Sequence, residues 1–422
     1  MQLKLTRTQG HYAHMYAFCA LLVVIAFVFD SPAAIGKGFI RILLSPSNLI
    51  TDYIEVGGLG AAFLNSGIIG LLSVLVLHIH RVQLSGMAIA GLITICGFAF
   101  FGKNIFNSLP ITLGVYLYAL LKKIPFKALA VTSLFATALG PLISVLSFGL
   151  GLTLWKGILA GYCAGILIGL VIPPLADAFY NFHQGFNLYN IGFTAGIVGM
   201  FATGILRMFN LQVNSTLILS SGNNLVLSIF LLWLFAVVFL VGLYYNRWSF
   251  KSYRKLLGYS GRLRTDFVEK CGYGITLINM ALMGVASWTY IILIGCSLNG
   301  ATIGAIFTVM GFSAFGNHPR NTLPIFLGAF GASLLNVHAP SSTEAVIATL
   351  FGSTLAPIAG HFGPLAGIFA GFVHVSMTMN VSYLHGGMNL YNNGFSGGFV
   401  AATLTPLYNA IAERCRLNQE RS

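Results

Sequence analysis

The chain carries one sixteen-residue segment twice, first as HQGFNLYNIGFTAGIV at 183–198 and again as HGGMNLYNNGFSGGFV at 385–400. Ten of the sixteen positions are identical. Other segments match at a constant displacement of 214 residues, among them FGKNIFNSLPITLG at 101–114 and FGNHPRNTLPIFLG at 315–328. Matches of this length within one chain indicate an internal duplication.

Composition places this duplicated chain in a membrane. Hydrophobic residues make up 57% of the 422 residues, charged residues only 7%, and the mean hydropathy is +0.85. A soluble domain has about 25% charged residues, so this chain has too few charged residues to form a water-exposed surface over its whole length. The net charge of +13 does not indicate nucleic acid, because the basic residues lie in short clusters between apolar stretches. The six cysteines form no CxxC pair, and we predict no metal or cofactor.

The sequence predicts an all-α polytopic membrane protein with about fourteen transmembrane segments. A spanning helix needs about 20 apolar residues. We divide the chain into a first repeat at 1–211 and a second at 212–422, each with seven such segments. The segments lie at 12–29, 57–80, 84–102, 107–121, 128–147, 154–173 and 187–208, and at 223–246, 272–294, 298–316, 321–336, 343–359, 361–380 and 389–410.

Charge placement predicts that the two repeats are inverted in the membrane. With a cytoplasmic N-terminus and fourteen alternating spans, 17 of the 22 basic residues fall inside, including the linker cluster at 247–270. The loop 122–127 is basic, whereas its counterpart 336–342 has no Lys or Arg. An odd number of spans per repeat puts equivalent loops on opposite sides. We therefore expect a multi-pass cell-membrane protein with both termini in the cytoplasm.

Two segments leave an alternative open. The stretches 128–147 and 343–359 each follow a proline and contain another, so they could be re-entrant half-helices. That arrangement would move the basic cluster 247–270 outside, against the charge bias. We favour spans for these two stretches, and expect the fold to contain broken or re-entrant helices.

The repeated NLYN blocks are the first candidate site. Their polar residues are Asn187, Tyr189, Asn190 and His183 in the first repeat, and Asn389, Tyr391, Asn392 and His385 in the second. Polar groups inside a membrane are costly unless they are hydrogen-bonded or line a polar path. One interpretation is hydrogen bonding between packed helices. The other is that both blocks open a helix at matching positions and line a solute path.

Two proline-containing turns form a second candidate. Proline removes a backbone donor and can break a helix. Asn107 and Asn321 sit where an N-cap would be expected before Pro110 and Pro324. Ordinary capping is one interpretation, and a helix break at a pore is the other.

Four carboxylates form a third candidate: Asp52, Glu55, Asp266 and Glu269. The pattern Thr-Asp-x-x-Glu is typical of a helix N-terminus, where acidic side chains complement the helix dipole. Coupling-ion or proton binding is the alternative, weakened by an expected position at the surface. Glu344 has no acidic counterpart in the other repeat, and His318 and Arg320 could form a gate or simply a charged loop.

Parts of each repeat resemble urea transporters. The segments GLGAAFLNSGIIGLL at 58–72 and LNGATIGAIF at 298–307, with the two LPI-x-LG turns, carry the resemblance. It implies that Asn65, Asn279 and Asn299 lie beside a solute path. Ser85 departs from the family's pattern, and the NLYN blocks have no counterpart there. As a whole, the chain resembles an uncharacterised, internally duplicated family of bacterial membrane proteins.

We therefore expect a transport protein or channel for a small, polar, neutral solute, with its path at the interface of two inverted repeats. An ion- or proton-coupled carrier of a small organic substrate is the alternative. A membrane-embedded enzyme and a receptor or scaffold rank below both, since no HExxH or GxSxG motif and no long soluble tail is present. The expected partners are the solute, the lipid bilayer and, in a homo-oligomer, further copies of the chain.

Overall fold

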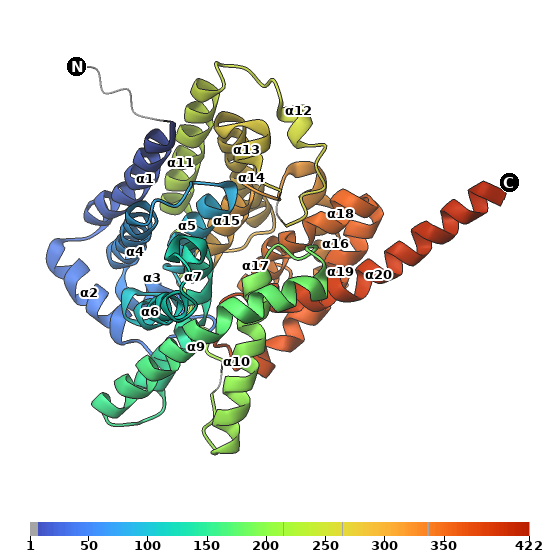
Figure 1. Cartoon of the computed structure of the whole chain (residues 1–422). Coiled ribbons are helices and arrows are strands. Elements are labelled where there is room, and N and C mark those ends of the chain that lie inside the picture. The colour runs from blue at the N-terminus through green and yellow to red at the C-terminus, as the bar shows by residue number, and fades with distance from the viewer. Residues whose placement is uncertain (1–6, 214, 264, 336, 422) are drawn as a thin grey trace.

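The computed structural model describes residues 7–213, 215–263, 265–335 and 337–421. Over these ranges the chain is helical, with two isolated β-bridges between extended segments. Nine of the described helices are long and apolar enough to cross a membrane. The protein is therefore a multi-pass, all-helical membrane protein (Figure 1).

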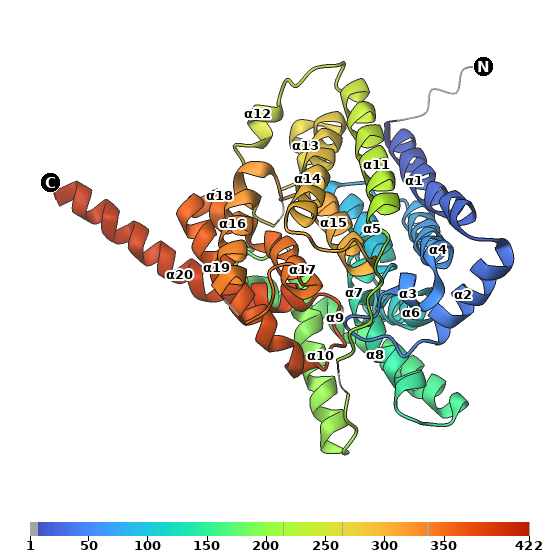
Figure 2. The same cartoon turned by 180° about the vertical axis from the view of Figure 1, so that it is seen from behind.

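The first half contains, in chain order, α1 (Arg7–Phe29), α2 (Pro32–Leu44), α3 (Tyr53–Gly57), α4 (Leu59–Ile79), α5 (Gly86–Phe98), α6 (Ile105–Leu121), α7 (Ala130–Ala136), α8 (Gly140–Ser144), α9 (Leu154–His183) and α10 (Asn190–Met208). The second half contains α11 (Asn224–Tyr245), α12 (Tyr253–Leu256), α13 (Phe267–Cys271), α14 (Tyr273–Leu293), α15 (Gly300–Phe312), α16 (Pro319–Leu335), α17 (Thr343–Phe351), α18 (Ala356–Phe362), α19 (Pro364–Val381) and α20 (Asn392–Arg421). Each of α13 to α16 begins and ends 214 residues after its counterpart among α3 to α6. In both halves the first long helix packs along the second, α1 on α4 and α11 on α14 (Figures 1 and 2).

Helices α5 and α15 form the antiparallel pair at the centre of the molecule. A Cβ at Gly86, where α5 begins, would lie 2.2 Å from the carbonyl oxygen of Ala314 beyond the end of α15. A Cβ at Gly300, where α15 begins, would lie 2.3 Å from the carbonyl oxygen of Phe100. The start of each helix therefore touches the end of the other, and only glycine allows this approach.

Helices α5 and α15 are also shorter than the sequence predicted. They end at Phe98 and Phe312, and a turn follows before α6 and α16. Gly102 has φ +81°, which allows the first of these turns. Thirteen residues rise only about 20 Å, less than the ~30 Å hydrocarbon core. The predicted fourteen full spans are thus not confirmed, because hydropathy does not register a turn between two apolar helices.

The stretches that could have been re-entrant are broken helices of full length. A 3-10 turn, Thr137–Leu139, separates α7 from α8, and a second, Gly352–Leu355, separates α17 from α18. The stretches Ala130–Gly149 and Thr343–Phe362 are each long and apolar enough to span, and both are mostly buried. The breaks lie where each broken helix meets an NLYN block: Leu390 donates from its backbone N–H to Ala138 O, and Leu188 to Thr354 O.

Candidate functional site

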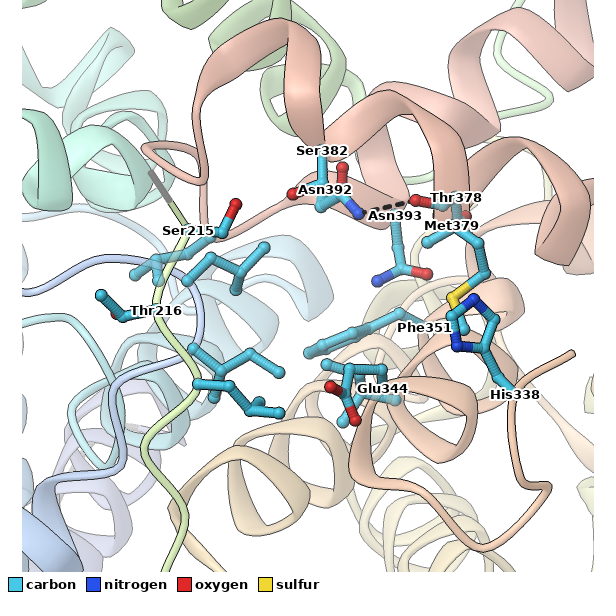
Figure 3. A pocket seen from close by; sticks show the side chains of 15 residues that line it. Ser215, Thr216, His338, Glu344, Phe351, Thr378, Met379, Ser382, Asn392 and Asn393 are labelled. Carbon is cyan, nitrogen blue, oxygen red and sulfur yellow. Dashed lines mark hydrogen bonds between the residues drawn. The ribbon is translucent and has the colours of Figure 1, made fainter. Parts of the chain in front are cut away.

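A cavity of about 230 Å³ lies beside the start of α20 and is the candidate solute site. Its walls come from the start of α17, the end of α19, the start of α20 and two extended segments at 49–50 and 215–217. We call it the Glu344 cavity, because Glu344 is the acidic residue in its lining. In Figure 3, Ser215 and Thr216 stand across the opening from Glu344, Phe351 and Asn393.

Glu344 enters this cavity from the first turn of α17. The N-cap residue Ser342 accepts a hydrogen bond from Ala345 N at 3.3 Å, which fixes where the helix begins. Glu344 is half-buried. No hydrogen bond or ion pair joins its carboxylate to another residue in the described part of the chain. A carboxylate in a helix's first turn is favoured by the dipole, so the local structure tolerates this charge.

The amides of Asn392 and Asn393 line the same cavity from the start of α20. Asn392 Nδ2 donates to Thr378 O at 3.1 Å, and its Oδ1 lies 2.8 Å from His385 Nε2 (Figure 3). Asn393 Oδ1 lies 3.1 Å from His374 Nε2. These bonds use both groups of Asn392 but only the oxygen of Asn393, so within the described part of the chain the Asn393 Nδ2 donor is available to a ligand.

Aromatic rings close the floor of the Glu344 cavity. Phe351 lines the cavity, and its ring centroid lies 6.3 Å from that of Tyr189. Tyr189 in turn lies 5.4 Å from Tyr391, and Tyr391 lies 4.6 Å from Phe98. The two tyrosines are buried, one from each NLYN block. A continuous series of ring contacts therefore runs from Phe351 in the cavity wall to the junction of the two NLYN blocks.

The first asparagine of each NLYN block joins the two repeats. Asn187 Nδ2 donates to Gly394 O at 3.0 Å, and Asn389 Nδ2 donates to Gly192 O at 3.2 Å. Each Oδ1 accepts from the backbone N–H two residues on, that of Tyr189 or Tyr391. These amides are fully buried and hydrogen-bonded, as expected for groups that hold packed helices together.

The second asparagine and the histidine join neighbouring helices within each repeat. His183 Nε2 lies 2.8 Å from Asn190 Oδ1, the same distance as in the pair of His385 and Asn392. Asn190 Nδ2 donates to Ala176 O at 3.0 Å. As predicted, the blocks open helices at matching positions, α10 at Asn190 and α20 at Asn392. Within the two blocks, Leu390 and Asn392 line the Glu344 cavity.

The asparagines of the urea-transporter resemblance have local partners. Asn65 Nδ2 donates to Ala99 O at 2.7 Å and to Lys103 O at 2.8 Å, which holds the turn after α5. Asn279 makes the equivalent two bonds to the turn after α15. Asn299 caps α15 and donates to Thr343 Oγ1 at 2.9 Å, beside Glu344 but outside the cavity lining.

The proline turns differ from the prediction. Asn107 and Asn321 are not the N-caps but the third helical residues of α6 and α16. Asn107 Oδ1 accepts from Asn104 N at 3.0 Å, and Asn104, the true cap, accepts in return. The helices also continue through Pro110 and Pro324. The helical breaks lie several residues before the prolines, in the turns that follow α5 and α15.

The four predicted carboxylates occupy different environments. Asp52 and Asp266 cap α3 and α13, as the Thr-Asp-x-x-Glu pattern predicted. Asp52 does not lie at the surface, however, since it is fully buried, whereas Glu55 and Glu269 are exposed. Asp52 Oδ2 accepts from Ser220 Oγ at 2.6 Å. Burial raises the pKa of Asp52, and hydrogen bonds from Ser220, Ile54 and Gly300 oppose that shift.

A second cavity of about 370 Å³ lies at the other end of the broken helix α17–α18. We call it the His361 cavity; Tyr259, His318 and Arg320 also line it. His318 Nε2 lies 2.9 Å from Tyr259 O. Burial lowers the pKa of His318 to about 4, and the nearby Arg320 charge adds to the shift, so His318 is neutral at pH 7.

Sequence reasoning missed the burial of Lys103. The residue is 1% exposed, with Nζ 2.5 Å from Thr137 Oγ1 and 3.5 Å from Leu134 O, at the break after α7. Its counterpart at +214 is Asn317, whose buried amide has no hydrogen-bond partner among the described residues. The Lys-to-Asn difference between the two repeats was the only available signal. Among the described residues, no group of three or more His, Cys, Asp and Glu side chains is placed to hold a metal ion.

The fold and these sites define a multi-pass helical membrane protein built from two related halves. The family model described as "Protein of unknown function (DUF1576)" matches residues 31–208 and 245–410, which is more than half of the chain. The chain belongs to this family, so the predicted membership of an uncharacterised duplicated family is confirmed. No curated protein and no solved structure matches the chain, and the resemblance to urea transporters finds no support.

Proposed function

We propose that this protein transports a small polar solute across the cell membrane, along a path between its two repeats. The observation that carries the proposal is the position of two cavities at the two ends of one broken helix, α17–α18. Glu344 and His361 are 17 residues apart, which corresponds to at most about 25 Å of helix. That length is comparable with the ~30 Å hydrocarbon core.

Inverted repeats are part of the proposal. Helices α5 and α15 are antiparallel, and the start of each meets the end of the other. This arrangement supports a two-fold rotation axis that runs perpendicular to both helices. Hydrogen bonds of Asn65 and His183 recur at Asn279 and His385, 214 and 202 residues later, which supports the pairing of these segments as structural equivalents. In this arrangement the basic segment 247–270, the loop 122–127 and both termini face the cytoplasm, and the Glu344 cavity opens to the opposite side.

The floor of the Glu344 cavity supplies the barrier that a carrier needs. Phe351 lies in the cavity wall and its ring adjoins the Tyr189–Tyr391 pair, so these rings would close the path toward the far end of α17–α18. The 3-10 turn Gly352–Leu355 directly follows Phe351, and such a turn within a helix often marks a hinge. Bending at this turn would move Phe351 and open the barrier toward the His361 cavity.

An ion- or proton-coupled carrier is the second candidate, favoured by Lys103. Lys103 has no carboxylate partner among the described residues, and burial lowers the pKa of its ammonium group to about 7. Ionisable groups buried in membrane proteins commonly serve ion or proton pathways. Asp52, predicted as a possible ion ligand together with Glu55, Asp266 and Glu269, accepts hydrogen bonds from Ser220, Ile54 and Gly300. These bonds leave Asp52 less available than Lys103 for ion or proton binding.

Flux into proteoliposomes tests the proposal. Purified protein is reconstituted, and uptake of labelled polyols, short amides, amino acids, amines and short carboxylates is followed against protein-free liposomes. We expect saturable uptake of one class, competed by its unlabelled form. Absence of saturable uptake for every class, from protein that stays monodisperse, would contradict a transport function. Repeating the assay with imposed proton and sodium gradients separates passive from coupled transport.

A further inference from the structure

We infer that the solute of the Glu344 cavity carries a cationic nitrogen, as in a small ammonium or amidinium compound. This inference rests on the proposed transport function and names the substrate class of the same site. The sequence predicted a neutral solute because so few charges lie in apolar segments. The position of Glu344 changes that expectation.

The charge of the cavity lining is the first argument. Glu344 is the acidic residue of the lining, and the lining residues that the structure describes include no Lys or Arg. His338 stands at the exposed rim, and His385 and His374 lie behind the amides of Asn392 and Asn393. The chain as a whole has 22 basic and 9 acidic residues, so an acidic cavity runs against its composition. The cavity therefore selects for positive charge and excludes anions.

The unpaired state of the Glu344 carboxylate is the second argument. It is half-buried, and among the described residues no Lys or Arg lies with it in the cavity lining and no side chain donates a hydrogen bond to it. Carboxylates in membrane-embedded cavities are usually paired, because an isolated charge loses hydration there. A bound cation supplies the missing partner through a charge-assisted hydrogen bond, which is among the strongest polar contacts in proteins.

The face of α17 that lines the cavity is the third argument. Glu344, Ile347 and Phe351 are spaced at i, i+3 and i+7, and all three line the cavity. A carboxylate and an aromatic ring on one helix face suit an ammonium group, since the ring face attracts cations as well. The hydroxyl of Ser215 and the free Nδ2 of Asn393 then remain for a polar substituent.

The size of the cavity limits the solute. Its volume of about 230 Å³ lies below the ~300–1,000 Å³ of pockets that hold drug-sized ligands. The ligand is therefore a small amine, amidine or zwitterion rather than a peptide or a polyamine chain.

Binding to the full-length protein in detergent, measured by calorimetry at pH 7, tests the inference. The probes are methylammonium, guanidinium, glycine, acetamide and acetate. We expect the cationic probes or glycine to bind and acetamide and acetate not to bind. Glu344→Gln should weaken that binding about tenfold or more, as expected for loss of a charge-assisted contact. Glu344→Asp, which keeps the charge, should retain part of it.

Glu413→Gln is the matched control, since Glu413 is an exposed acidic residue of α20 far along the chain from the cavity. It should bind the probes as the unchanged protein does. Binding of cations that survives in Glu344→Gln overturns the inference, as does a preference for acetamide or acetate. In both cases proteoliposome uptake of the bound probe still supports transport. If no probe binds and no class is taken up, the inference and the proposed function both fail.

Discussion

Asp266 of the second repeat accepts a hydrogen bond from the backbone N–H of Gly86 in the first, with 2.8 Å between Gly86 N and Asp266 Oδ2. The counterpart bond runs the other way, from Gly300 N to the carboxylate of Asp52. Each short helix of the central pair is thus held at its start by a carboxylate from the opposite repeat. The helix dipole adds to these bonds, because carboxylates are favoured at helix N-termini.

These reciprocal bonds predict unequal effects of two matched substitutions. Asp52→Asn should lower the free energy of unfolding by about 1–3 kcal/mol, because its amide Nδ2 would face buried donors. Asp266→Asn should cost less, since Asp266 is only partly buried. Thermal unfolding in detergent, followed by tryptophan fluorescence, measures both. Equal midpoints for the two variants would contradict the assigned difference in burial.

The close approach of α5 and α15 predicts that neither contact glycine tolerates a methyl group. Gly300→Ala would place Cβ 2.3 Å from Phe100 O and 2.4 Å from Asp52 Oδ1, so backbone must move. Such overpacking typically costs about 1–3 kcal/mol. Gly331→Ala is the control, because Gly331 lies within α16 with open space around its Cβ position. It should stabilise the protein slightly, by up to about 1 kcal/mol. Similar melting of the two variants would argue against the α5–α15 contact.

Because the chain is duplicated, much of this fold could be predicted from its sequence. The constant displacement of 214 residues correctly related α3 to α13, α4 to α14, α5 to α15 and α6 to α16, because insertions are absent from that stretch. Composition identified the membrane class for a physical reason: few charges leave no soluble surface. The true lengths of α5 and α15 were not readable, because Asn65 and Asn279 hold turns that carry no hydropathy signal.

The Glu344 cavity was harder to predict from the sequence than the fold. The NLYN blocks pointed to the junction of the repeats, but the Glu344 cavity is assembled from five separate segments. Glu344 carried only a weak signal, its lack of an acidic counterpart. The burial of Asp52 was missed because its partner Ser220 lies 168 residues away in the chain. Long-range hydrogen bonds of this kind leave no local pattern.

The proposed inversion predicts the sidedness of three loops. None of the six cysteines is in a disulfide, so they can be replaced to give a cysteine-free background. Single cysteines at Lys127, Lys251 and Ala339 are then labelled in intact cells with a membrane-impermeant maleimide. We expect labelling of Ala339→Cys from outside, and labelling of the other two only after the membrane is opened. Labelling of the first and third positions from the same side would show parallel repeats.

Substitution of Lys103 should affect transport without lowering the stability of the protein. Lys103→Met keeps the apolar stem and removes an ammonium that is buried without a carboxylate partner in the described chain. Replacing such a group by an apolar one is often neutral or stabilising, so the melting temperature should hold or rise. If Lys103 serves ion coupling, gradient-driven uptake should be lost while passive exchange of solute continues. Lys103→Asn, which copies Asn317 of the other repeat, should behave like Lys103→Met. Unchanged gradient-driven uptake in both variants would remove Lys103 from the coupling mechanism.

The pseudo-symmetry offers a matched pair for testing the Glu344 cavity itself. Asn392 and Asn190 make the same two bonds, one to the block's histidine and one to a backbone carbonyl on the preceding helix. Of the two, Asn392 lines the cavity. Asn392→Leu and Asn190→Leu should therefore both lower the melting temperature, each losing two hydrogen bonds worth about 0.5–1.5 kcal/mol apiece, with the smaller loss at Asn190, whose bonds are only partly buried.

Their effects on transport should differ. Asn392→Leu brings an apolar side chain into the cavity wall and should raise the KM for uptake about tenfold, whereas Asn190→Leu should leave KM near that of the unchanged protein. Saturation curves in proteoliposomes measure both, with protein amounts matched by quantitative immunoblot. A KM that rises equally in the two variants would indicate that the loss of helix packing, rather than the cavity, controls uptake. The solute path would then have to be sought at the Tyr189–Tyr391 junction, which both repeats share.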